Sequence, residues 1–323
     1  MPMRGWWVLA VAFVGGYVWC QGSDELKRLA AEDQADRTQW LSMSVEERLA
    51  VQSRDTERRK RAAELIESDA LTTAEDFDSA ALLFQHGTSP DDFEVARELA
   101  LMAFHMGRPT SLVALAEDRF LVHINRPQRF GSQFAVSGSG PLTMNRVDTG
   151  TRASVTDALR LDSLQPPLDV LQKQSTEAVE ASMPAILERL KERTDNAWQI
   201  TALATPESLE LSKLAKGRST QAARARVLEL YAADKLAAPL DYLNAAKVLT
   251  ESSEPPARLL ANELAAVAFV RGQPDAGPLF ALTWDRFLGG IGRPTRYGTR
   301  GTKRVRPSVS PAVRRAFGLE EAL

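Results

Sequence analysis

The feature that most constrains the fold of this chain is an internal repeat. The segment 118–131, DRFLVHINRPQRFG, returns as DRFLGGIGRPTRYG at 285–298. Upstream, residues 76–109 align with 241–274 at one fixed offset. A long segment that occurs twice is expected to form two related units rather than one continuous core. We therefore predict two homologous copies of one domain in tandem.

The two copies differ in their histidines. All three histidines of the chain lie in the first copy, at positions 86, 105 and 123. The corresponding positions of the second copy carry Glu251, Val270 and Gly290. Histidine is the side chain that titrates near neutral pH and most often ligates metals. Any proton or metal chemistry is therefore predicted to belong to the first copy.

Composition favours a helical protein that does not bind nucleic acid. The 323 residues are 44% hydrophobic, which is enough material for two globular domains. Only 7% are aromatic, whereas Ala, Leu, Glu and Arg are abundant, a balance typical of helices. A net charge of −2 argues against a strongly basic nucleic-acid binder.

The N-terminus resembles an export signal. Arg4 precedes an uncharged, mostly apolar run from Trp6 to Val18, and polar sequence begins at Gln21. The run is shorter than the roughly 20 residues that span a bilayer comfortably. We predict cleavage after Gly22 and a location outside the cytoplasm, in the periplasm or attached to the membrane. An uncleaved membrane anchor and a lipid on Cys20, the single cysteine, are the alternatives.

Local signals divide the remaining chain into helical segments. We predict a mainly α fold, with a first copy over 23–168, a connecting helical region over 169–222 and a degenerate second copy over 223–323. Ser44 and Glu47 form a capping box, and Ser89-Pro90 begins a helix that stops near Gly107. Extended runs at 132–136 and 142–147 flank a Gly-rich turn and predict a small β-hairpin in the first copy.

Two candidate catalytic residues lie in the first copy. His86 ends a predicted helix, where it could act as an acid, a base or a ligand; alternatively, it bonds only the free carbonyls of that helix. Asp118 is the second candidate. Because Asp118-Arg119 also occurs in the copy without histidines, a structural role in an intrahelical or interhelical ion pair is the alternative.

The loop 126–133 is the most unusual segment and supplies most of the candidate ligand-binding residues. It combines a rigid proline, a glycine, guanidinium groups and two amides, which suit recognition of a carbonyl, sugar or phosphate. Much of the loop recurs in the second copy, but Gln128 and Gln133 change to Thr295 and Arg300. The predicted ligand-binding residues are Gln85, Arg119, Arg126, Gln128 and Gln133.

No cofactor or metal site is predicted. The chain has no G-x-S-x-G, H-E-x-x-H, P-loop or dinucleotide-binding fingerprint, and its histidine spacings fit no helical metal pair. The segment 286–319 contains no acidic residue and nine basic ones. This segment predicts contact with an anionic surface such as lipid phosphates, or it balances the acidic helices earlier in the chain.

Several of these segments together resemble a bacterial family of unknown function. They are Gln85-His86, Asp118-Arg119, the loop 126–133 and the stretch 155–168, against a family pattern of "QH … DR … GrPQrYGTQ". Asp33 to Arg37 is similar to the D-x-x-x-R helix with which family members begin. The resemblance covers residues 24–170 and, in degraded form, 220–320. It implies a fold and a candidate site, but no reaction.

Two functional hypotheses remain. In the first, the protein is an exported binding module of the cell envelope whose partner is an envelope protein or a small ligand. In the second, the first copy is a hydrolase-like enzyme that uses His86, and the second copy is inactive. The observation that would distinguish them is whether His86 shares one cleft with Asp118, Gln128 and Gln133. We predict that these four residues line one concave surface.

Overall fold

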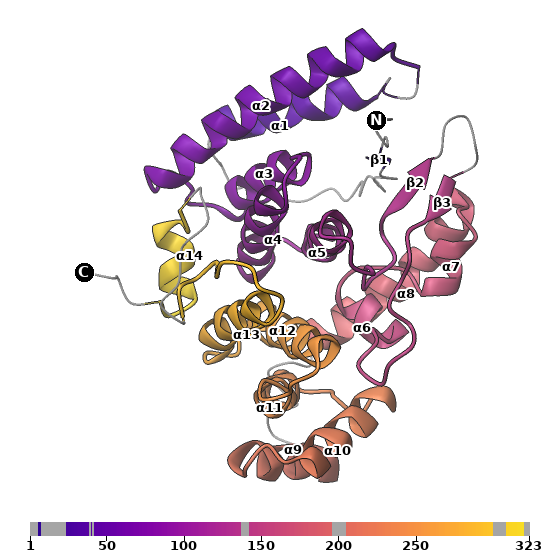
Figure 1. Cartoon of the computed structure of the whole chain (residues 1–323), viewed down its shortest axis with the longest axis vertical. Coiled ribbons are helices and arrows are strands. Elements are labelled where there is room, and N and C mark those ends of the chain that lie inside the picture. Colours follow the sequence, from indigo (N-terminus) through magenta and orange to yellow (C-terminus); the bar gives the residue numbers. More distant parts are fainter. Residues whose placement is uncertain are drawn as a thin grey trace. The chain divides into compact units, whose positions relative to one another are not determined.

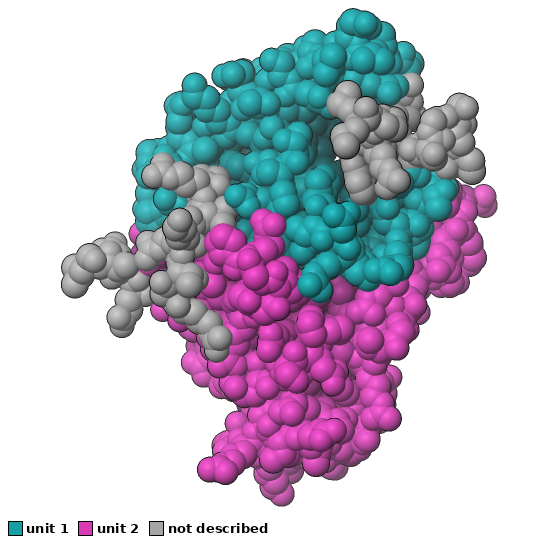
Figure 2. Space-filling model, viewed as in Figure 1, with its two compact units in different colours: residues 1–128, 132–146, 306–313 teal, residues 129–131, 147–305, 314–323 magenta. Residues whose placement is uncertain are grey.

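The chain divides into two compact units, coloured separately in Figure 2. The computed structural model describes residues 6–7, 24–38, 40, 42–136, 142–195, 205–299 and 308–319. Unit 1 comprises 1–128, 132–146 and 306–313, and unit 2 comprises 129–131, 147–305 and 314–323. The units therefore do not follow the bounds of the sequence copies: a short part of the loop 126–133, and everything from 147 to 168, belongs to unit 2.

Unit 1 contains five helices and a small sheet among its described residues (Figure 1). The elements are β1 (Trp6–Trp7), α1 (Asp24–Arg37), α2 (Val45–Glu67), α3 (Ala74–Gln85), α4 (Pro90–His105), α5 (Leu112–His123), β2 (Phe134–Val136) and β3 (Leu142–Met144). Helices α1 and α2 lie alongside each other, and α4 packs against both α3 and α5.

Capping boxes begin three of these helices. The Ser44 hydroxyl accepts a hydrogen bond from the Glu47 amide, while the Glu47 carboxylate accepts one from the Ser44 amide. Thr73 and Ser89 do the same at the starts of α3 and α4. The predicted starts at Ser44 and Ser89 are thus confirmed, because side chains there satisfy amides that the first helical turn leaves without partners.

The predicted hairpin is present. Strands β2 and β3 pair antiparallel, with Phe134 opposite Met144 and Val136 opposite Leu142. Residues 137–141, which include the whole predicted Gly-rich turn, lie outside the described part of the chain. Strand β1 adds to the other edge of β2, with Trp6 opposite Ala135. The prediction of a mainly helical chain with a small hairpin is confirmed.

Unit 2 is almost entirely helical in its described residues. Its helices are α6 (Asp157–Asp162), α7 (Leu168–Gln172), α8 (Thr176–Asp195), α9 (Pro206–Lys216), α10 (Gln221–Ala232), α11 (Pro239–Leu249), α12 (Pro255–Val270) and α13 (Ala276–Gly290). The last helix, α14 (Pro311–Ala316), has residues in both units. Helix α12 packs against α11 and α13.

The helices α3–α5 of unit 1 and α11–α13 of unit 2 share local geometry at equivalent positions. Helices α4 and α12 both end at a glycine with positive φ, Gly107 and Gly272. Asp76 and Asp241 both accept hydrogen bonds from the two amides that precede their helix. These recurrences agree with the sequence repeat, and superposition of the Cα traces over 76–131 and 241–298 stays a prediction.

An apolar stripe on α4 forms part of the core of unit 1. Ala96, Leu99, Ala100 and Ala103 are all 0% exposed. Small side chains at this spacing let neighbouring helices approach closely.

No helix of the described residues is long and apolar enough to cross a membrane. The segment 1–22, interpreted from its sequence as an export signal, lies outside the described residues except for Trp6–Trp7.

Candidate functional site

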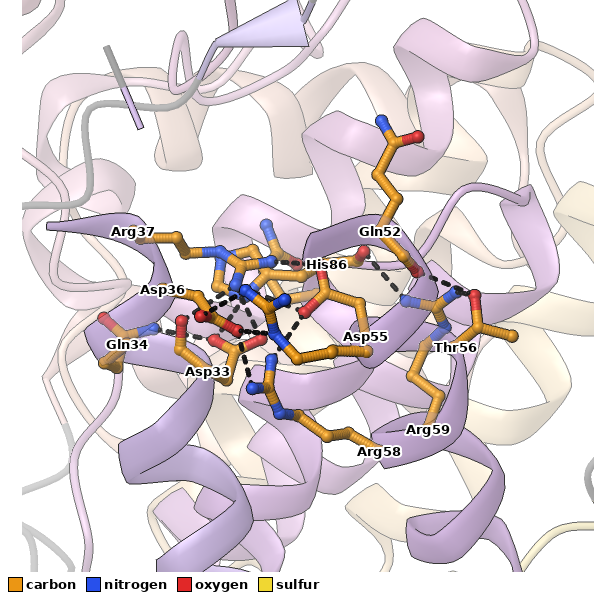
Figure 3. A network of polar contacts seen from close by, with 12 residues as sticks. Asp33, Gln34, Asp36, Arg37, Gln52, Asp55, Thr56, Arg58, Arg59 and His86 are labelled. Atoms are coloured by element: carbon orange, nitrogen blue, oxygen red, sulfur yellow. Dashed lines mark hydrogen bonds and ion pairs between the residues drawn. The ribbon is translucent and has the colours of Figure 1, made fainter. Parts of the chain in front are cut away.

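A histidine–carboxylate pair is the centre of the candidate site in unit 1 (Figure 3). His86 caps the C-terminus of α3, and its Nδ1 lies 2.8 Å from Oδ2 of Asp33 on α1. The Asp33 side chain is 1% exposed and that of His86 11%. With a proton on Nδ1 donated to Asp33, Nε2 presents its lone pair, and it has no hydrogen-bond partner among the described residues.

The surroundings keep His86 neutral. Burial lowers the pKa of His86, and the charges of Arg37 and Arg119 lower it further, against the opposing influence of Asp33. Burial favours a higher pKa for Asp33, but the hydrogen bond from His86 and the nearby positive charges outweigh it, so the pKa falls. At neutral pH the pair is therefore an ionised carboxylate that orients a neutral imidazole.

Arginines from α1 and α2 match the acids around this pair. Arg37 lies 2.9 Å from an Asp33 oxygen and 2.8 Å from Asp55. Arg58 pairs with Asp55 at 3.0 Å and with Asp36 at 2.6 Å. Arg54 also pairs with Asp36 at 2.6 Å. The three carboxylates of this network and these three guanidinium groups balance in charge. Figure 3 shows Asp33, Asp36 and Asp55 close to Arg37 and Arg58.

Arg119, on α5, is buried without such a match. Its Nη1 donates to the carbonyl oxygen of Gln85, and its Nε donates to Oε1 of Gln133 at 3.3 Å. Its guanidinium carbon lies 5.7 Å from the centre of the Phe93 ring. Among the described residues, no carboxylate forms an ion pair with Arg119. Burial, and then the charge of Arg37, lower the pKa of Arg119 to about 9.

Arg129, another buried arginine, differs from Arg119 because it has a carboxylate partner. Arg129 is 0% exposed, and its Nε lies 2.6 Å from the carboxylate of Glu263 within unit 2. Although burial opposes it, the charge of Glu263 raises the pKa of Arg129 above its usual value. A buried charge normally has such a counter-ion. Arg119 has a positive charge that only neutral groups contact.

Gln85 is a second buried polar side chain whose interactions are incomplete. Its side chain is 1% exposed, and neither its amide nitrogen nor its amide oxygen has a hydrogen-bond partner among the described residues. A buried polar group in this condition costs about 1–3 kcal/mol. Its counterpart in the second copy, Thr250, donates its hydroxyl proton to the carbonyl of Ala246.

The side chain of Gln128 has a structural role. Its amide nitrogen donates to the carbonyls of Gln133 and Asn145, and its amide oxygen accepts from the Gln133 amide. These side-chain contacts hold the backbone of the loop 126–133 and join it to the residue that follows β3. Gln133, by contrast, reaches Arg119 with its side-chain oxygen and the Ser132 hydroxyl with its nitrogen.

Asp118 also holds the loop. One of its oxygens accepts from both the amide and the hydroxyl of Ser132. In the second copy, Asp285 accepts in the same way from the amide and hydroxyl of Thr299. A contact common to both copies argues for structure rather than catalysis. It also differs from the ion pair with Arg119 that the sequence suggested, because Arg119 turns to Gln85 and Gln133.

The predicted site residues are therefore only partly brought together. Arg119 connects the Gln85 backbone with the Gln133 side chain, and Gln85 is followed directly by His86. Arg126 is half-buried and closes α5 through its backbone amide, which donates to Leu121. No side-chain contact ties Arg126 to the site among the described residues. Whether these residues line one concave surface stays a prediction.

Sequence reasoning did not identify Asp33 and Arg37 as site residues. They entered only through the D-x-x-x-R pattern of the family resemblance. The spacing itself carries a signal, because residues four apart share one helix face and can act on a common neighbour. The sequence alone could not name His86 as that neighbour, since 53 residues separate it from Asp33.

The equivalent position in the second copy is constructed differently. Arg286, the counterpart of Arg119, donates through Nη1 to the carbonyl of Thr250, just as Arg119 donates to that of Gln85. The same Nη1 forms an ion pair with Glu251, the residue that replaces His86. The second copy thus supplies its arginine with a carboxylate of its own.

The basic segment 286–319 is not uniformly available at a surface. Arg296 is 0% exposed, and Arg286 is paired with Glu251. Arg300, Lys303, Arg304 and Arg306 lie outside the described residues. Within the described part of the chain, no group of three or more His, Cys, Asp or Glu side chains could hold a metal ion.

Comparisons with protein-family models, with curated proteins and with solved structures returned no match. The family resemblance therefore stays a prediction.

Proposed function

We propose that unit 1 is a ligand-binding module, and that its site is formed by His86, Arg119 and Gln133. The observation that carries this proposal is the buried guanidinium of Arg119, which has neutral partners only, next to a neutral imidazole with a free Nε2. Such an arrangement is costly in an empty protein and favourable once a ligand supplies the missing charge.

The second copy supports the proposal that the two copies have different roles. With Glu251 beside Arg286, its equivalent position has no unmatched cation and no imidazole. We therefore assign ligand binding to the first copy and a structural part to the second.

Thermal unfolding of the full chain tests this proposal. A panel of small anions, sugars and amides is added in turn, and the unfolding temperature is compared between the wild type and Gln133→Ala. A ligand that binds the native state raises the unfolding temperature. We expect at least one compound to stabilise the wild type and to lose most of that effect in Gln133→Ala. Equal stabilisation of both proteins would contradict the assignment.

A second candidate function is proton transfer, which the Asp33–His86 pair favours. A neutral imidazole oriented by a carboxylate through Nδ1 can accept a proton at Nε2, as general bases do. The test is hydrolysis of ester and amide substrates by the wild type and by His86→Gln. A rate that falls at least a hundredfold in the variant supports catalysis, whereas equal rates restrict His86 to binding.

We also propose that the protein is exported and works in the cell envelope, in contact with an envelope protein or a small ligand. The charge and hydropathy pattern of residues 1–22 supports this. The basic residues 300–306 are the part of the C-terminal segment proposed to contact an anionic surface. Co-purification of envelope proteins with the mature chain, compared with a variant in which Arg300, Lys303, Arg304 and Arg306 are changed to Gln, tests this proposal.

A further inference from the structure

In both copies, an arginine donates a hydrogen bond to an equivalent backbone carbonyl. The copies differ in the residue that follows this carbonyl. Arg119 donates to the carbonyl of Gln85, and Arg286 donates to that of Thr250 at the equivalent position. In the second copy, the residue that follows this carbonyl is Glu251, and its carboxylate pairs with the guanidinium. The corresponding residue of the first copy is His86, whose imidazole contacts Asp33.

Glu251 shows which chemical group this arrangement accepts. Its carboxylate pairs with Arg286 and lies at the end of a side chain that is 56% exposed. In the first copy, the imidazole of His86 is bonded to Asp33 instead, so no carboxylate of the described residues reaches Arg119. A guanidinium fork and a carboxylate match in charge and in geometry.

We propose that the ligand of unit 1 presents a carboxylate group, and that this group binds Arg119 in the way that Glu251 binds Arg286. The inference rests on the proposed binding function and names the chemical class of the ligand. Nε2 of His86 has no hydrogen-bond partner among the described residues and is therefore available to a second atom of the same ligand.

The charge balance of the site favours a singly charged group over phosphate. Asp33, Asp36 and Asp55 are matched by three arginines, and His86 is neutral. Arg59, which donates to the His86 carbonyl, is paired with Asp92 at 4.0 Å. One positive charge, that of Arg119, therefore remains. A carboxylate neutralises it, whereas a doubly charged phosphate would leave a buried negative charge without a partner.

The test follows the imidazole resonances of His86 by NMR in the full chain, assigned by their loss in His86→Gln. Sodium acetate, sodium phosphate and sodium chloride are compared over pH 5–8 at one ionic strength. The groups facing this imidazole are Asp33 and Arg37 of α1, Arg59 of α2, whose Nη1 donates to the His86 carbonyl, and Arg119 of α5.

We expect acetate to raise the pKa of His86, because a bound anion stabilises the protonated imidazole. A rise of about one unit corresponds to about tenfold tighter binding of acetate to the protonated form. Chloride should give no such shift. A shift with phosphate and none with acetate would overturn the carboxylate assignment and leave the binding function intact. The assignment also fails if only neutral compounds bind in a Gln133-dependent way.

Glu251→Gln gives a matched test in the second copy. The substitution removes the carboxylate from Arg286 at a well-exposed position, where it should not prevent folding. Acetate should then raise the unfolding temperature of Glu251→Gln more than that of the wild type, since it replaces the missing group. Equal responses of the two proteins to acetate would show that Glu251 does not stand in for a ligand, which removes the basis of the inference.

Discussion

At the scale of single residues, two buried polar side chains of the candidate site lower the stability of the protein without ligand. A bound ligand that contacted them would offset this cost. Gln85 holds an amide without partners in a buried position, and Arg119 holds a charge without a counter-ion among the described residues. Natural proteins keep such costs mainly where function needs them. Stability measurements on the protein without ligand should reveal both costs.

Gln85→Met tests the first cost. The substitution keeps side-chain length and apolar contacts but removes the amide, so the free energy of unfolding should rise by about 1–3 kcal/mol. Chemical denaturation of the full chain measures this change. Thr250→Val is the matched control in the second copy. It should lower stability by about 0.5–1.5 kcal/mol, since the Thr250 hydroxyl is satisfied. A clear loss of stability in Gln85→Met would contradict the account.

His86 should make stability depend on pH in a defined window. Burial lowers its pKa in the folded state below the unfolded value of about 6.5, so the unfolded chain takes up the proton first as the pH falls. The contribution of His86 to the free energy of unfolding is therefore at its maximum above about pH 6.5. It declines as the pH drops toward the pKa of His86 in the folded state. Denaturation between pH 7.5 and 5 should show a smaller decline in His86→Gln.

A control for this measurement exists in the same unit. The pKa of His123 is also lowered, mainly by burial, and its Nδ1 contacts the Arg119 carbonyl. His123→Gln should remove a separate share of the decline. If His86→Gln had the same pH profile as the wild type, the lowered pKa of His86 would be wrong.

At the scale of elements, the loop that follows α5 and the loop that follows α13 are each held by a carboxylate of the preceding helix. Asp118, on α5, fixes the loop through Ser132, and Asp285, on α13, fixes its own loop through Tyr297 and Thr299. In each case a helical carboxylate binds backbone amides some 12 to 14 residues further along the chain.

Asp118→Ala and Asp285→Ala should therefore have similar effects. Each leaves at least one buried amide, that of Ser132 or of Tyr297, without its acceptor. The expected loss in each variant is about 1–3 kcal/mol of unfolding free energy. Denaturation of both variants measures it. A large effect of Asp118→Ala on ligand binding at unchanged stability would instead restore Asp118 to the site itself.

The elements also show how far sequence reasoning reaches. The capping boxes at Ser44 and Ser89, the buried face of α4 and the hairpin follow from rules that act within a few residues, and all were predictable. The Asp33–His86 pair depends on how α1 packs against the end of α3, and no local pattern fixes that. For the same reason, the sequence suggested an ion pair for Asp118 and Arg119, although their side chains have different partners in the fold.

At the scale of the whole molecule, the ligand site proposed above belongs to the first copy alone. The second copy keeps the framework contacts of Asp241 and Asp285 but replaces the histidine and the two glutamines. The proposed place of work is outside the cytoplasm, which depends on residues 1–22.

Intact-mass measurement of the protein isolated from fractionated cells tests export. The protein should be found outside the cytoplasm, and the mature mass should lack residues 1–22. In that case β1 would be absent from the mature chain, and the sheet would be the β2–β3 hairpin alone. A chain found in the cytoplasm with an intact N-terminus would contradict the export proposal.

The central claim is that Arg119 lacks a carboxylate partner which Arg286 has. A crystal structure of the full chain grown in sodium formate tests it most directly, because both arginines are seen in one molecule. We predict a formate ion bound to Arg119, and Glu251 with no added ion at Arg286. An Arg119 paired with a carboxylate of the chain itself, with no formate bound, would contradict the account.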